Sequence, residues 1–177
     1  MRVLITGTPG TGKTTVAKEL ARRMGWRLVS IASAARADGL VEGRGHEVDV
    51  KKLKAALLKR LRGLDDFIVE GHLGCEFRLP VDCVFVLRTA PAELEKRLKS
   101  RNYSAGKTEE NLMSELLDYC LQLSEANYAV PVLQLDTTKA TAVRTARRIS
   151  DFLNGKVKTL DNVWWGRELR EKTKGNP

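Results

Sequence analysis

The chain has few of the residues and patterns that mark several common protein classes. Its three cysteines, Cys75, Cys83 and Cys120, are odd in number and show no C-x-x-C spacing, so we expect neither a disulfide framework nor a structural zinc site. Its apolar runs are far shorter than a membrane span, and neither repeats nor low-complexity segments are visible. Residues 2–6 already have a strand pattern, so no leader peptide is visible and we expect none. We therefore expect one globular domain of 177 residues, cytoplasmic and monomeric, without membrane contact.

Positive charge exceeds negative charge over the whole chain. The sequence has 31 lysines and arginines against 22 aspartates and glutamates, a net charge of +9. An anionic nucleotide accounts for part of this excess, and a larger polyanion such as RNA or a ribonucleoprotein accounts for the rest. A solvated surface rich in lysine and arginine explains the same number, so both interpretations stay open.

One stretch near the N-terminus has a specific motif. Residues 7–14 read Gly-Thr-Pro-Gly-Thr-Gly-Lys-Thr and match G-x-x-x-x-G-K-[ST], between an apolar run and a helical pattern. In this context the glycines turn backbone N–H groups toward phosphate, and the helix N-terminus adds its positive end. Lys13 reaches the β- and γ-phosphates, and the Thr14 hydroxyl ligates Mg²⁺. An ordinary glycine turn would not combine all of these features, so we predict a P-loop that binds ATP.

Strand and helix patterns alternate along the chain. The predicted strands are residues 2–6, 26–30, 66–70, 81–87 and 130–135, and the predicted helices are residues 13–24, 49–62, 91–101, 108–127 and 139–153. This order predicts an α/β fold, the three-layer P-loop NTPase fold with a five-stranded parallel sheet. Residues 31–48 lack a strong period and are interpreted as a mobile insert with a short helix at 32–38. Gly7, Glu70 and Arg88 end predicted strands and should converge at one edge of the sheet.

Five residues are candidates for catalysis. Glu70 ends an apolar strand, as a Walker B carboxylate does, although an acidic residue in a surface turn has the same pattern. His72 could orient a water molecule or polarise a substrate oxygen, but a lone histidine is more often structural. Arg97 and Arg101 lie four apart on a predicted helix, where they contact phosphates or adenine or form a solvated pair. Lys13 completes the set.

The order of these features resembles a nucleoside monophosphate kinase, and several short motifs narrow the match. They are residues 70–76 (EGHLGCE), 84–88 (VFVLR), Arg97-Leu98, 101–104 (RNYS), Lys107, Glu110-Asn111 and Glu115-Leu116. The motifs resemble the CINAP-type adenylate kinases, atypical enzymes associated with maturation of the small ribosomal subunit. The resemblance covers about residues 1–153, and its most specific part lies between Arg97 and Glu115.

The resemblance implies a kinase domain over residues 1–155, with an NMP-binding part at about 30–53 and a short lid at about 102–112. The implied reaction converts ATP and AMP into two ADP with Mg²⁺, with broader NMP acceptance and an accompanying ATPase activity. The implied ATP contacts are Gly7, Pro9, Gly10, Thr11, Gly12, Lys13, Thr14, Thr15 and Arg101. Arg36 and Arg88 are the expected NMP contacts, and Thr14 and Glu70 the expected metal ligands. The family has Asp where this chain has Glu70.

The resemblance also implies a partner, a small-subunit ribosomal protein of the platform, with contact to the ribosomal RNA. The tail at residues 156–177 lies outside the match and has six basic residues, three acidic residues and the pair Trp164-Trp165. It folds back, binds a partner or forms a short amphipathic helix. Two other functions stay open: a nucleotide-driven ribosome assembly factor that acts mainly by ATP hydrolysis and binding, and a small-metabolite kinase of the shikimate or gluconate type.

Overall fold

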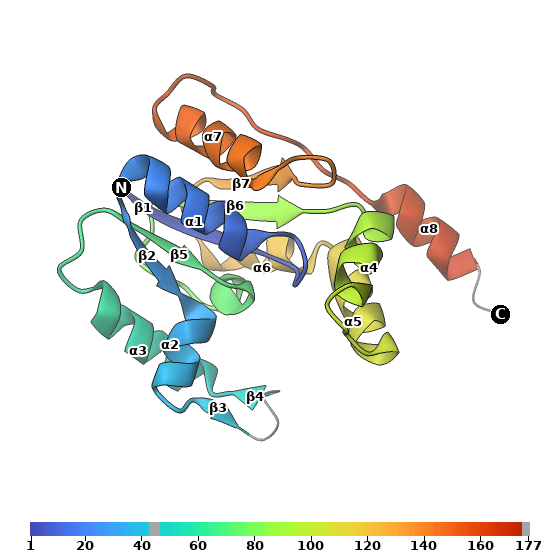
Figure 1. Cartoon of the computed structure of the whole chain (residues 1–177), viewed down its shortest axis with the longest axis horizontal. Coiled ribbons are helices and arrows are strands. Elements are labelled where there is room, and N and C mark those ends of the chain that lie inside the picture. The colour runs from blue at the N-terminus through green and yellow to red at the C-terminus, as the bar shows by residue number, and fades with distance from the viewer. Residues whose placement is uncertain (43–46, 175–177) are drawn as a thin grey trace.

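A parallel sheet forms the centre of the protein, whose computed structural model describes residues 1–42 and 47–174 (Figure 1). Its five strands lie in the order β2-β5-β1-β6-β7. They are β1 (Arg2–Gly7), β2 (Arg27–Ser30), β5 (Phe67–Glu70), β6 (Cys83–Arg88) and β7 (Val132–Asp136). The prediction of a five-stranded parallel sheet in a P-loop α/β fold is confirmed, with strand ends displaced by at most two residues.

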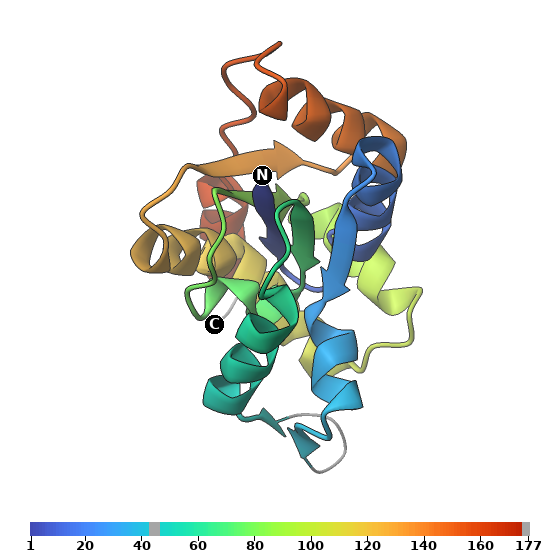
Figure 2. The ribbon, with the colours of Figure 1, turned by 90° about the vertical axis from the view of Figure 1, so that its left-hand side faces the viewer.

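Helices cover both faces of the sheet (Figure 1, Figure 2). On one face, α1 (Lys13–Met24) and α7 (Ala142–Leu153) pack on a core that includes Ile5, Phe85 and Leu87. On the other face, α3 (Val50–Leu61) and α6 (Tyr119–Asn127) pack on Leu4 and Val86. Every residue of β5 and β6 is buried, as expected for strands that are covered on both sides.

The insert after β2 is a helix followed by a small hairpin. The helix α2 (Ile31–Ala37) begins where the Ser30 hydroxyl accepts a hydrogen bond from the Ser33 N–H, an N-cap. Two short antiparallel strands follow, β3 (Val41–Glu42) and β4 (Glu47–Val48). The helix predicted at 32–38 is therefore confirmed, whereas residues 43–46 of the predicted NMP-binding part lie outside the described residues.

The long helix predicted at residues 108–127 is wrong, because the structure has two helices there. The first is α5 (Ala105–Leu116), and α6 begins at Tyr119. Between them Asp118 has a φ of 55°, a left-handed conformation that interrupts helical hydrogen bonding. The break lets the Asp118 carboxylate pair with the guanidinium of Arg88 at the end of β6. A contact distant in sequence thus overrides the local helical pattern.

Two further short elements surround the ends of the strands. A 3₁₀ turn, η1 (His72–Cys75), follows β5, and α4 (Pro91–Lys99) follows β6. Leu94 and Leu98 of α4 pack against Leu112 of α5 in a small separate core. None of the helices in residues 1–42 and 47–174 has the length and apolar content that a bilayer span requires.

The C-terminal segment folds back onto the sheet before it ends in α8 (Gly166–Lys174). Asp161 forms an antiparallel bridge with Gln134 of β7, and its carboxylate pairs with Arg148 of α7 at 2.7 Å. Helix α8 then lies beside α5, with Lys172 2.9 Å from Glu109 (Figure 1). The sequence left three possibilities for the tail, and two of them, folding back and a short helix, are both present; residues 175–177 lie outside the described part.

Candidate active site

The P-loop connects β1 to α1 in the geometry that its glycines require. Gly10 and Gly12 have φ angles of 97° and 93°, which side-chain-bearing residues rarely adopt. A Cβ on Gly10 would also lie 2.7 Å from the Cδ1 of Leu94, so α4 packs directly against the loop. The loop is therefore fixed from outside as well as by its own turns.

Lys13 lies inside the loop rather than in solvent. Its Nζ donates a hydrogen bond of 2.9 Å to the carbonyl of Thr8, and burial lowers the pKa of its ammonium group. The Thr11 hydroxyl donates to the same carbonyl at 2.9 Å. An ammonium group has three donors, so a phosphate in the loop can take the other two.

Glu70 and Thr14 meet at the carboxyl end of β5. The Thr14 hydroxyl donates to Glu70 Oε2 at 3.1 Å, and only 3% of Glu70 is exposed. The parallel register places Glu70 opposite Ile5, two residues before Gly7. Mg²⁺ at a phosphate site often has one or two protein oxygens besides phosphates and water, and a hydroxyl beside a carboxylate fits that donor set. Residues 1–42 and 47–174 contain no cluster of three or more His, Cys, Asp or Glu side chains suited to a metal.

His72 lies between the P-loop and the insert. Its Nδ1 is 3.3 Å from the carbonyl of Gly7 and 3.5 Å from the Sγ of Cys120. Burial and the nearby charge of Lys13 lower the pKa of His72 to about 4. The ring is therefore neutral at pH 7, with a proton on Nδ1 if it donates to Gly7.

A pocket of about 340 Å³ opens between the insert and the turn after β5. Apolar side chains of Ile31, Ala35 and Leu73 form much of its wall, and Arg36 and His72 are its ionisable residues. Its size is at the lower end of the range for small-molecule sites. Since His72 also contacts the Gly7 carbonyl, the pocket adjoins the P-loop.

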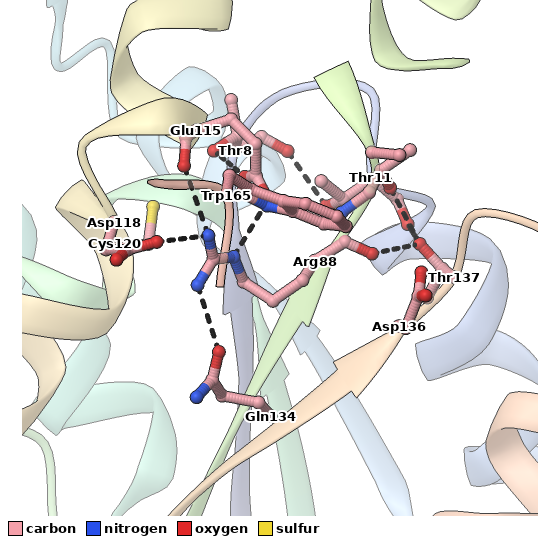
Figure 3. Close-up of polar contacts among 12 residues, drawn as sticks. Thr8, Thr11, Arg88, Glu115, Asp118, Cys120, Gln134, Asp136, Thr137 and Trp165 are labelled. Carbon is pink, nitrogen blue, oxygen red and sulfur yellow. Dashed lines mark hydrogen bonds and ion pairs between the residues drawn. The ribbon is translucent and has the colours of Figure 1, made fainter. Parts of the chain in front are cut away.

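The structure does not place Arg88 with Arg36 in this pocket, contrary to the expectation of an NMP contact. Arg88 is 1% exposed, and its Nε donates to Glu115 Oε1 at 2.8 Å (Figure 3). Its other nitrogens donate to the amide oxygen of Gln134 and to the carboxylate of Asp118. A buried guanidinium needs such partners to offset desolvation, and none of them lines the pocket beside α2.

Arg97 and Arg101 do not form the shared helical face that their spacing predicts. Helix α4 ends at Lys99, and Arg101 follows in the exposed turn that leads to α5. Arg97 donates to the carbonyls of Thr137 and Thr138 at 2.8 and 3.0 Å, so it fixes the loop after β7. Arg101 remains available at the start of the predicted lid.

The other predicted ATP contacts lie in the loop or at the start of α1. Thr11 is buried and Pro9 half-buried in the loop, whereas Thr14 and Thr15 are exposed at the start of α1. The Thr11 carbonyl accepts a hydrogen bond of 3.0 Å from Thr137, which connects the loop to the end of β7.

Sequence reasoning missed the role of Glu115. This residue of α5 is 2% exposed, and its Oε2 accepts a 2.6 Å hydrogen bond from the hydroxyl of Thr8 in the P-loop (Figure 3). Its Oε1 accepts from Arg88 and from the indole N–H of Trp165. One signal was present: Arg88 ends a wholly apolar strand, and a buried arginine requires a buried acid somewhere in the chain.

Comparison with known proteins identifies the family. The family model described as "AAA domain" matches residues 3–118. The "Putative adenylate kinase" of Pyrococcus furiosus is 36% identical over 160 residues, which cover 89% of this chain and 87% of that protein. The "Putative adenylate kinase" of Methanothermobacter thermautotrophicus is 39% identical over 158 residues, which cover 86% of this chain and 90% of that protein. The chain belongs to this adenylate-kinase-like family of P-loop proteins.

Solved structures agree on the fold. Shikimate kinase from Bacteroides thetaiotaomicron has a TM-score of 0.65 at 16% identity and covers 87% of this chain and 98% of its own. Deoxyadenosine kinase from M. mycoides has a TM-score of 0.59 at 17% identity, and the match covers 87% of this chain and 100% of that one. These identities are too low to transfer a substrate, but they confirm the fold of a P-loop kinase.

Proposed function

We propose that the protein is a nucleoside monophosphate kinase, and specifically an adenylate kinase that converts ATP and AMP into two ADP. One observation carries the proposal: the P-loop adjoins a separate pocket with a single arginine, and His72 lies between them. A phosphoryl transferase needs two such sites, one for each nucleotide, with the reacting oxygens close together. The names of the archaeal relatives support the same assignment.

The P-loop provides the donor site. The backbone N–H groups of residues 10–14, which open helix α1, surround the ATP phosphates, and Lys13 places its positive charge beside the β- and γ-phosphates. Thr14 and Glu70 would hold Mg²⁺, which supplies charge neutralisation and alignment of the phosphates when bound. Exposed Arg101 lies at the start of the lid, where closure would bring its guanidinium onto the nucleotide.

The pocket beside α2 provides the acceptor site. Arg36 binds the phosphate of the monophosphate, and the apolar wall formed by Ile31, Ala35 and Leu73 contacts its base. An acceptor phosphate oxygen attacks the γ-phosphorus, a new P–O bond forms, and the bond to the β-phosphate oxygen breaks. Both products are then ADP. The attacking phosphate is already an anion at pH 7, so this transfer requires no strong general base.

We propose a slower ATPase reaction at the same site, in which water replaces the acceptor. His72 is placed for this role, because its neutral ring lies between the P-loop and the acceptor pocket. With Nδ1 directed at the Gly7 carbonyl, Nε2 can accept a hydrogen bond from water. Glu70 replaces the shorter Asp of CINAP-type enzymes, yet it still reaches the Thr14 hydroxyl.

The resemblance to CINAP-type enzymes implies a role in maturation of the small ribosomal subunit. We propose contact with ribosomal RNA or a platform protein on the basis of charge. Helix α3 has basic side chains on its exposed face, among them Lys51 and Lys59, and exposed Arg62 follows as its C-cap residue. Such a face attracts a phosphate backbone. This surface favours the second candidate, an assembly factor that couples ATP hydrolysis to binding, and the two activities are compatible.

The first test measures ADP formation from ATP and Mg²⁺, with and without AMP. A strong increase with AMP supports the kinase, and a panel of monophosphates together with shikimate then defines the acceptor. If AMP changes nothing while slow hydrolysis continues, the kinase proposal fails and the assembly factor is favoured. If only shikimate raises the output, a small-metabolite kinase replaces both.

A second test addresses the basic face of α3. The variant K51E/K59E should bind a structured RNA at least tenfold more weakly than the wild type and with a shallower salt dependence. The variant R144E/R147E, which makes the same change in net charge at two exposed arginines of α7, is the control for net charge. Equal RNA affinity of the wild type and K51E/K59E would refute the proposal that RNA binds to the basic face of α3.

A further inference from the structure

We propose that Trp165, in the C-terminal segment, is a positioning residue for the P-loop and acts on it through Glu115. The proposal rests on the proposed function only in that the P-loop binds a nucleoside triphosphate. It assigns a role in nucleotide binding to the C-terminal tail, which lies outside the predicted kinase domain. Trp165 lies directly before α8, in the segment that connects α7 to α8.

A single carboxylate connects the tail to the P-loop. The indole N–H of Trp165 donates to Glu115 Oε1 at 3.0 Å, and Glu115 Oε2 accepts from the Thr8 hydroxyl at 2.6 Å (Figure 3). Glu115 is 2% exposed and Thr8 is 1% exposed. Buried hydrogen bonds to an ionised group are stronger and more directional than exposed ones. A change at the indole therefore reaches Thr8 through one side chain.

Thr8 in turn orients the P-loop lysine. Its carbonyl accepts the hydrogen bonds from Lys13 Nζ and the Thr11 hydroxyl, both at 2.9 Å. A shift of Thr8 displaces this carbonyl and with it the direction of the ammonium group. A misplacement of about 1 Å at such a site is enough to weaken catalysis substantially.

Trp165 contributes in two ways to the position of Glu115. Its N–H is one of three donors on Oε1, together with the Nε of Arg88 at 2.8 Å and the N–H of Thr89 at 3.1 Å. Three donors on one oxygen fix the rotation of the carboxylate and direct Oε2 at Thr8. Its ring also lies 5.9 Å from the guanidinium carbon of Arg88, where it covers the buried ion pair (Figure 3).

The segment around Trp165 is anchored on both sides. Before it, Asp161 pairs with Arg148 at 2.7 Å and bridges to Gln134 of β7. After it, Lys172 of α8 lies 2.9 Å from Glu109 of α5. The indole is therefore held between the core and the predicted lid helix, and its contact with Glu115 does not depend on one bond alone.

The two adjacent tryptophans provide a matched test. Trp165→Phe keeps the ring over Arg88 and removes the N–H donor, whereas Trp164→Phe makes the same change at a side chain that is 66% exposed. Calorimetry with Mg²⁺ and a non-hydrolysable ATP analogue should show about tenfold weaker binding for W165F, and W164F should match the wild type. Equal affinities of W165F and W164F would overturn the proposal.

A double-mutant cycle with Thr8→Val separates positioning from a general structural effect. If Trp165 acts through Glu115 on Thr8, then W165F should lower the affinity for the ATP analogue much less in the T8V background than in the wild type. Additive losses would overturn the proposal. Failure of the wild type to bind the analogue would instead refute the nucleotide site, so the two failures are distinguishable.

A spectroscopic test does not require the W165F variant to fold. The chain has three tryptophans, so W26F/W164F leaves Trp165 as the only indole fluorophore. Addition of the analogue should change its emission with the affinity that calorimetry gives. If saturating analogue leaves the emission unchanged, the proposed connection between the P-loop and Trp165 is wrong.

Discussion

Two regions flank the P-loop, and they are held in place by different forces. On the side of the proposed acceptor pocket, α2 packs onto the core through Ile31, Ala34 and Ala35, and the pocket beside it opens to solvent. On the side of α5 and the tail, the contacts are buried hydrogen bonds and ion pairs around Arg88 and Glu115 (Figure 3). The first region is held by apolar contact and the second by directed polar contact.

The difference corresponds to what each region must do. Apolar packing is non-directional, so the contacts of α2 with the core do not fix one exact orientation. A carboxylate with four donors has one arrangement that satisfies them all, so Glu115 holds Thr8 at a defined place. The P-loop thus lies between a region of apolar contacts and a region of directed polar contacts.

The largest effect should come from the lysine that the rigid region orients. Lys13→Ala removes the positive charge that stabilises the transferring phosphoryl group. We expect kcat to fall by at least about 100-fold. Lys18→Ala, an exposed lysine on the same helix, is the control. Coupled assays of ADP formation provide the measurement, and near-normal turnover by a folded K13A protein would contradict the assignment.

Glu115→Gln tests whether the polar region depends on its central charge. The glutamine amide would place an N–H₂ group among the hydrogen-bond donors that now surround the Glu115 carboxylate. Of the two acids that pair with Arg88, Asp118 alone would then remain charged. We expect the free energy of unfolding to fall by about 2–3 kcal/mol, measured by urea denaturation. Glu110→Gln, whose side chain is 71% exposed on the same helix, should change it by less than about 0.5 kcal/mol. If both variants have the same free energy of unfolding, the charge of Glu115 does not stabilise the buried polar contacts around Arg88.

Arg36→Ala tests the acceptor side separately. Loss of one charge-assisted phosphate contact should raise KM for AMP by about tenfold and leave KM for ATP within about twofold. Arg167→Ala removes an exposed arginine from α8 and should change neither constant. A larger effect of R36A on ATP than on AMP would reverse the assignment of the two sites.

The smallest expected effect is on pH dependence. The pKa of His72 is lowered to about 4 in the folded protein, against about 6.5 in an unfolded chain. Between these values the unfolded state binds the extra proton, so stability is full above pH 6.5 and declines as the pH falls toward 4. His72→Gln should flatten this part of the stability profile, measured by thermal unfolding between pH 4 and 7. An unchanged slope would mean that other groups cause it.

Local patterns were enough to predict the scaffold and to place the P-loop close to Glu70. The glycine spacing located the P-loop, and the apolar run that ends at Glu70 predicted a carboxylate close to it, where the structure shows the bond to Thr14. Both depend on residues within one strand-loop-helix unit or on the shared edge of a parallel sheet. Such relations follow from chain order alone.

The polar network was beyond sequence reasoning because its members are far apart in the chain. Thr8 and Glu115 are separated by 107 positions, and Glu115 and Trp165 by 50. The break at Asp118 had no local signal such as glycine or proline and arises because Asp118 pairs with Arg88. Spacing predicted a common face for Arg97 and Arg101, but Arg97 instead binds two backbone carbonyls.

The bridge between Asp161 and Gln134 also bears on self-association. β7 is an outer strand, and a free outer edge presents unpaired backbone groups to other chains. Asp161 occupies part of that edge: its N–H donates to the carbonyl of Gln134 at 3.2 Å, and its carboxylate accepts from the N–H of Asp136 at 2.8 Å. A truncation after Gly155 would therefore expose the edge of β7 and favour edge-to-edge aggregation. The tail thus limits pairing of β7 with the same strand in another molecule.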